Sequence, residues 1–210
     1  MTTVGDVLDE FFSPLSRRTL WVMPESDNYT SIVREWQPVI DATNRTKQNL
    51  ALNGAIWSAN YVTRPQWQPM MTDTLKPNAY REFVRSPPGT DPETCKNAFI
   101  TYAASKVARF APIPVPVPEI QTRSLYTCSI GSFNIYTTVD VIDCAAKKAS
   151  LNYWMYNSMS KRSFGRFASH PAFALSGMAT QFMWWNWIEA VDWSSGAVRT
   201  LPRGAVAKRW

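Results

Sequence analysis

Histidine, paired cysteines and catalytic motifs are what this sequence has least of. His170 is the one histidine in 210 residues, and Cys95, Cys128 and Cys144 form no C-x-x-C spacing. An odd number of cysteines without that spacing argues against a disulfide framework and against a structural zinc site. We therefore expect no metal and no cofactor.

The motifs of common enzyme families are also missing. The sequence contains no G-x-S-x-G, G-x-G-x-x-G, G-x-x-x-x-G-K or H-E-x-x-H. A catalytic His170 would need a nucleophile and an orienting group nearby, and its position before Pro171 fits a helix start equally well. We predict that the protein is not an enzyme and has no small-molecule substrate. An enzyme with an unfamiliar site around Cys95 or His170 stays open as an alternative.

A secretion signal is not apparent at the N-terminus. The stretch MTTVGDVLDEFF carries acidic residues where a signal peptide needs a basic start and an apolar run. We therefore expect a protein that is not secreted.

Charge is scarce, at 18% of residues, and it is unevenly distributed. Residues 1–143 contain 13 Lys and Arg against 14 Asp and Glu, whereas residues 144–210 contain nine against two. Like charges held close together repel, and a negatively charged partner offsets this cost. The C-terminal third therefore predicts an anionic partner, although a solvated basic face or an acidic protein surface would show the same pattern.

The basic residues of the C-terminal third form two clusters, and aromatic residues are interspersed with the first of them. This pattern favours single-stranded nucleic acid as the partner, because exposed bases stack on aromatic rings. The predicted RNA-binding residues are Lys147, Lys148, Lys161, Arg162 and Arg166, with Arg45 and Lys47 in reserve. A second cluster in the tail includes Arg199 and Arg203, which we expect at subunit contacts.

Apolar spacing predicts a mainly α fold: a helical bundle core with a small β-hairpin and long proline-rich extended segments. Helices are expected after Thr3, over residues 29–61 with a break at Pro38, from Asp91 to about residue 110, over 141–156, and from Pro171 to Val191. The hairpin is expected around Ile130-Gly131-Ser132. Residues 1–193 are predicted to form one domain, with an irregular insertion at 62–91 and an extended strut at 112–118, followed by a basic tail at 194–210.

Residues 167–188 contain no Asp, Glu, Lys or Arg, a length that could span a bilayer. Their Ser, Thr, Gln and Asn make a membrane role the less favoured alternative, and a buried, protein-facing helix is the preferred interpretation. Trp184, Trp185 and Trp187 are predicted at subunit contacts, because aromatic residues are enriched at interfaces.

In its layout the chain resembles the coat proteins of rod-shaped and filamentous plant RNA viruses. The resemblance rests on the Asn/Gln/Thr-rich stretch 28–60, the near absence of histidine, the basic stretch 147–166, and the aromatic segment that runs into Trp193-Ser194-Ser195-Gly196. It implies a structural, enzyme-free protein that self-assembles and packages single-stranded RNA. The expected partners are RNA and further copies of the chain, in a virion or the host cytoplasm.

Overall fold

The computed structural model describes residues 2–64, 68–71, 78–85, 87, 90–108, 122–164 and 176–202. It is a mixed fold built on a six-stranded sheet, with 39% of residues in helices and 30% in strands. The prediction of a mainly α helical bundle was therefore wrong. The strut expected at 112–118 lies outside the described residues.

Seven helices and six strands are described. The helices are α1 (Val4–Phe12), α2 (Asn28–Arg34), α3 (Gln37–Leu52), α4 (Gly54–Asn60), α5 (Pro92–Ala108), α6 (Thr122–Ile130) and α7 (Lys161–Phe164). The strands are β1 (Thr19–Met23), β2 (Tyr80–Val84), β3 (Phe133–Asp143), β4 (Lys148–Met159), β5 (Gln181–Asp192) and β6 (Arg199–Thr200).

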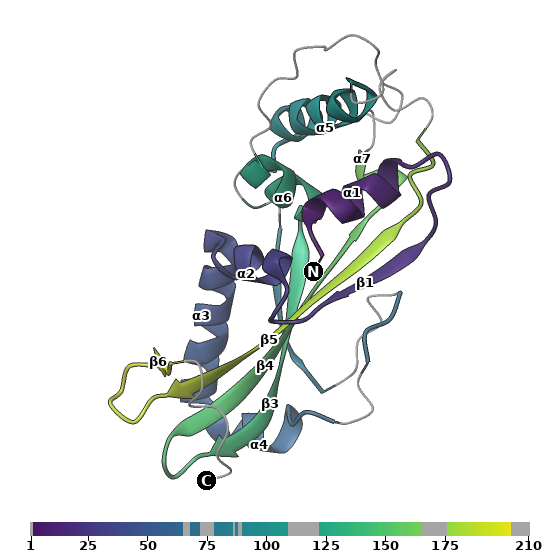
Figure 1. Ribbon diagram of the computed structural model, residues 1–210. Coiled ribbons are helices and arrows are strands. Elements are labelled where there is room, and N and C mark those ends of the chain that lie inside the picture. Colours follow the sequence, from purple (N-terminus) through teal and green to yellow (C-terminus); the bar gives the residue numbers. More distant parts are fainter. Residues whose placement is uncertain are drawn as a thin grey trace.

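The strands follow the order β1-β5-β4-β3-β2, and β6 also pairs with β5. β1 runs parallel to the start of β5, while the other pairs are antiparallel. Figure 1 shows β3, β4 and β5 side by side, with α1, α6 and α7 around one end and the β3–β4 and β5–β6 turns at the other. The sheet therefore has two distinct ends, which we call the helix end and the turn end.

The helix predicted from Pro171 to Val191 is instead strand β5 over its second half, and its first residues lie outside the described ranges. β5 is apolar on both faces: Met183, Trp185 and Trp187 pack under the helices, while Phe182 and Trp184 pack on the opposite face. A segment that is buried on two sides loses the alternation that marks a strand, and it then resembles a buried helix.

The helical spacing predicted over 141–156 was also wrong, because these residues form the end of β3, a turn and most of β4. The hairpin expected around Gly131 lies elsewhere, since α6 ends at Ile130 and the tight turn between β3 and β4 is residues 144–147. The insertion expected to be irregular at 62–91 contains the edge strand β2.

The helix boundaries near polar caps were confirmed. In α1 the Thr3 side chain accepts from the backbone N–H of Asp6, while the Asp6 carboxylate accepts from the backbone N–H of Thr3. Asp91 accepts from the backbone N–H of Thr94 at 2.9 Å at the start of α5. Pro38 lies in the first turn of α3, so the expected break is a junction between two helices.

The two faces of the sheet pack differently. On the helix-covered face, Tyr29, Trp57, Tyr153, Trp185 and Trp187 belong to the main core. A smaller aromatic cluster occupies the second face and consists of Tyr136, Tyr156, Phe182 and Trp184. The segment 68–71 crosses this second face, where the Trp184 indole N–H donates to the Met70 carbonyl at 2.9 Å.

A disulfide bond joins Cys95 in α5 to Cys128 in α6, with the Cα atoms 5.2 Å apart. The argument against disulfides from the odd cysteine count was therefore wrong: one pair forms, and Cys144 remains as an exposed free thiol. The bond ties together two helices that lie over the same end of the sheet (Figure 1).

Candidate nucleic-acid interface

The predicted RNA-binding cations do not form one groove. Lys147 and Lys148 lie at the turn end, and Lys161 and Arg162 follow the other end of β4. A 12-residue strand separates the two pairs, a distance of about 36 Å at the usual rise per residue. Arg166 lies outside the described residues. The cations that were close in the C-terminal sequence are therefore far apart in the fold.

At the turn end, carboxylates balance the cations. Lys148 stands opposite Asp143 on one neighbouring strand and opposite Asp192 on the other, and Asp192 also stands opposite Arg199. Hydrogen bonds from Ser194, with smaller contributions from Lys148 and Arg199, lower the pKa of Asp192. Asp192 therefore stays negatively charged beside these cations.

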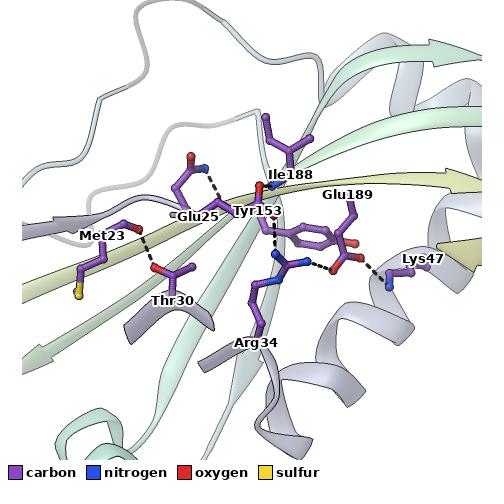
Figure 2. A network of polar contacts seen from close by, with 9 residues as sticks. Met23, Glu25, Thr30, Arg34, Lys47, Tyr153, Ile188 and Glu189 are labelled. Atoms are coloured by element: carbon purple, nitrogen blue, oxygen red, sulfur yellow. Dashed lines mark hydrogen bonds and ion pairs between the residues drawn. The ribbon is translucent and has the colours of Figure 1, made fainter. Parts of the chain in front are cut away.

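The two reserve cations, Arg45 and Lys47, are already paired. Lys47 Nζ lies 2.7 Å from Glu189 Oε2 and donates to Thr200 Oγ1 at 2.9 Å. Arg34 joins the same carboxylate, and its other guanidinium nitrogen lies 2.6 Å from Glu25 (Figure 2). Arg45 Nε donates to the Glu82 carboxylate at 3.0 Å. These contacts connect α2 and α3 to the sheet. They leave the buried Lys47 unavailable as a phosphate contact, whereas Arg45 is paired but 50% exposed.

The Arg45–Glu82 pair extends to Tyr80, which gives a pH prediction. Tyr80 donates to Glu82 Oε1 at 2.9 Å, and burial together with the nearby carboxylate raises its pKa to about 12. An unfolded tyrosine ionises near about 10, so this contribution to stability is complete below pH 10 and is lost as the pH rises toward 12. In urea unfolding at increasing alkaline pH, wild type should lose stability more steeply than Tyr80→Phe. Parallel curves for the two proteins would contradict the prediction.

Five exposed cations gather at the helix end, and we call this surface the basic end. It comprises Arg17, Arg18, Arg85, Lys161 and Arg162. The first two precede β1, Arg85 follows β2, and the last two follow β4, so all three strand ends lie at the same end of the sheet. The sheet spans about 19 Å from β1 to β2 at the usual strand spacing. None of the five side chains forms an ion pair with another described residue.

The register explains how residues far apart in the sequence meet here. Thr19 in β1 stands opposite Gln181 in β5, and Gln181 stands opposite Met159 in β4. Arg18 comes just before β1, and Lys161 comes just after β4. In the sheet only β5 lies between these two strands. Two strand spacings, about 10 Å, separate these positions. Sequence reasoning identified Lys161 and Arg162 but missed Arg17, Arg18 and Arg85, because only strand pairing brings them together.

Two carboxylates lie near the basic end and limit its charge. Glu10 accepts from the backbone N–H of Arg17 at 2.8 Å. Asp91 caps α5, and hydrogen bonds from Thr94 lower its pKa. Both carboxylates are satisfied by backbone donors, and the five cations outnumber them.

Next to the basic end, the second face of the sheet is aromatic and polar. Arg18 lies over the Phe182 ring at 5.3 Å, and Arg81 lies over the Tyr136 ring at 5.9 Å. Successive residues of a strand point to opposite faces, so the strand pairing shows which side chains belong to the second face. Outside the turn end they are, from β2 across to β1, Arg81, Phe83, Asn134, Tyr136, Thr138, Asn152, Trp154, Tyr156, Ser158, Phe182, Trp184, Asn186, Ile188, Leu20 and Val22. None of these described positions is Asp or Glu. Tyr136, Tyr156, Phe182 and Trp184 are buried, so the side chains of this face that are open to a negatively charged ligand include Arg81 and the partly exposed Trp154, Asn152 and Asn186.

A cavity of about 390 Å³ opens beside α7. Its lining comes from α5, α6, the end of β4 and α7, and includes the Cys95–Cys128 disulfide, the buried Asn157 and several serine hydroxyls. The cavity therefore combines polar hydroxyl and amide groups with an apolar wall.

The residues predicted at subunit contacts are mostly inside the protein. Trp185 packs against Tyr29 of α2 and Trp187 lies under Arg34 of α2 in the main core, while Trp184 packs in the cluster on the second face. All three are at most 3% exposed, so their rings are not available on the surface. Arg199 is exposed at the turn end, and Arg203 lies outside the described residues.

The described residues give little support to the two alternatives, an enzyme or a membrane-associated protein. Cys95 is bonded to Cys128 and is not a free nucleophile, while His170 lies outside the described residues. Within the described ranges, no three His, Cys, Asp or Glu side chains are grouped as metal ligands. The same part of the chain contains no helix that is both long and apolar enough to cross a bilayer, and residues 181–188 of the proposed span are strand.

A scan against protein-family models finds no match, and searches of curated proteins and of solved structures find no significant similarity. The function therefore has to be argued from the geometry of the basic end and of the second face.

Proposed function

We propose that this chain is a structural, non-enzymatic protein that binds and packages single-stranded RNA, with the basic end as its phosphate-binding surface. One observation carries the proposal: five exposed cations from three separate strand ends meet at one end of the sheet without forming ion pairs among the described residues. Cations that share one surface give it a positive potential, and a polyphosphate backbone binds such a surface with release of counterions.

The surroundings of the basic end support a single strand in preference to a duplex. On the adjoining second face the aromatic cluster is buried, but Trp154, Asn152, Asn186 and Ser158 are partly exposed and supply aromatic, amide and hydroxyl groups. The cavity beside α7 could take one unstacked nucleotide. Single strands expose their bases to such groups, whereas a duplex keeps them stacked.

The test compares two matched triple variants in binding to a fluorescent oligouridylate. Arg18→Gln/Lys161→Gln/Arg162→Gln removes three charges from the basic end, and Lys147→Gln/Lys148→Gln/Arg199→Gln removes three from the turn end. We expect the first triple to weaken binding on the order of 30-fold and to reduce the slope of log K against log salt by about 2, since single strands release about 0.7 counterions per contact. The control triple should bind nearly as wild type.

Equal weakening by both triples would mean that RNA responds only to net charge, and the basic end would then have no special role. Binding of wild type that does not change with salt would count against phosphate contacts altogether. Both triples leave the core and the ion pairs of α3 intact, so circular dichroism should show unchanged folding.

A further inference from the structure

The sheet has two open edges among the described strands. At one edge β1 covers the start of β5 and β6 covers its end, and β1 stops at Pro24, which has no N–H to donate. β2 pairs with β3 on one side and with no described strand on its other side. An unprotected edge is a template for pairing with another chain.

The side chains of β2 are suited to a second copy of the same strand. Arg81 and Phe83 both point to the second face of the sheet, and Phe83 is 54% exposed, the most exposed large apolar residue in any described strand. Arg81 is held in place, because its Nε donates to Asn134 at 2.9 Å and its guanidinium lies over Tyr136.

We propose that β2 pairs with β2 of a second copy, antiparallel and two-fold symmetric about Glu82, which joins two sheets into one. This register puts Arg81 of each copy opposite Phe83 of the other, so each exposed ring meets a cation that is already ordered. A shift by two residues in either direction would put Arg81 opposite itself or opposite Arg85. Those registers are disfavoured because Arg81 and Arg85 form no ion pair with a described residue that would offset the repulsion.

The same two-fold symmetry also determines which of the remaining charged side chains face each other. On the helix-covered face, Glu82 meets Glu82 of the partner, and each carboxylate keeps its own Arg45 at 3.0 Å. The two strands run in opposite directions, so the two basic ends point to opposite ends of the combined sheet. The dimer therefore forms without bringing the two basic ends together.

This inference extends the self-association part of the proposed function, and it is tested without RNA, so that the two can fail separately. Sedimentation of the purified full chain at increasing concentration should show a dimer. Phe83→Lys should raise the dissociation constant on the order of 100-fold, because a two-fold interface contains the substitution twice. The controls are Val22→Lys on the β1 edge and Leu52→Lys on α3, both exposed in wild type, and neither should change it.

A second measurement tests the register and needs no loss of folding. In a Cys144→Ser background, protein with Arg81→Cys is mixed with protein with Phe83→Cys under mild oxidation. Disulfide-linked heterodimers should form faster than homodimers of either protein alone. A monomer at all concentrations, a dimer broken by Val22→Lys but not by Phe83→Lys, or equal cross-linking in all three samples would overturn the proposal.

Discussion

Replacing Glu189 with Met is expected to destabilise the protein by about 3–5 kcal/mol, because two cations would lose a buried partner. Glu189 is 12% exposed, and the side chains of Arg34 and Lys47 are 18% and 10% exposed. Lys47 would keep only the hydroxyl of Thr200, and Arg34 would keep Glu25 (Figure 2). Urea unfolding measures the change as a lower midpoint at an unchanged slope.

Two comparisons separate this cause from a loss of packing. Glu35→Ala removes an exposed carboxylate at the end of α2 that has no ion pair with a described residue, and it should change stability by less than about 0.5 kcal/mol. Adding Lys47→Met to Glu189→Met should recover much of the loss, since an apolar pair can replace a buried ion pair at little cost. If the double variant is less stable than Glu189→Met, the unpaired charge is not the cause.

The same network shows what the sequence could and could not predict. Arg34 and Glu25 are near in sequence, but Lys47 and Glu189 are 142 positions apart. Only the packing of α3 against the sheet brings them together. Charge counting treated Lys47 as a free cation, because the sequence contains no signal of its partner. A basic residue can be assigned to a ligand only after its carboxylate neighbours are known.

Helices with polar caps could be predicted, and strands with two buried faces could not. Thr3 and Asp91 fix the starts of α1 and α5 by local hydrogen bonds that the sequence shows directly. β5 carries Trp184 on one face and Trp185 on the other, so its apolar residues follow neither a helical nor an alternating period. Mistaking this central strand for a helix changed the predicted fold class.

The residues of the basic end could be predicted from the sequence only in part. Lys161 and Arg162 are adjacent, and they formed part of the predicted cluster. Arg18 and Arg85 lie in segments whose net charge is unremarkable, so their role depends on strand order alone. Lys147 and Lys148 were assigned to the same surface because residues 148–156 of β4 were interpreted as part of a helix, and in a helix that stretch would span only about 13 Å.

Loss of the Cys95–Cys128 disulfide is the second change expected to have a large effect. The bond closes a loop with a sequence separation of 33, so its removal in Cys95→Ala/Cys128→Ala should cost about 2–4 kcal/mol. The apolar residues of α5 do not gather on one side, and among its described side chains Phe99 and Tyr102 are buried against α1, so the disulfide adds a covalent tie to α6. Cys144→Ala, at the exposed free thiol, is the matched control and should leave stability unchanged.

Reducing agent provides the decisive comparison. Wild type and Cys144→Ala should both lose stability when dithiothreitol is added, down to the level of the double variant, while the double variant should not respond. A wild type that is equally stable with and without the reductant would mean that the bond does not contribute.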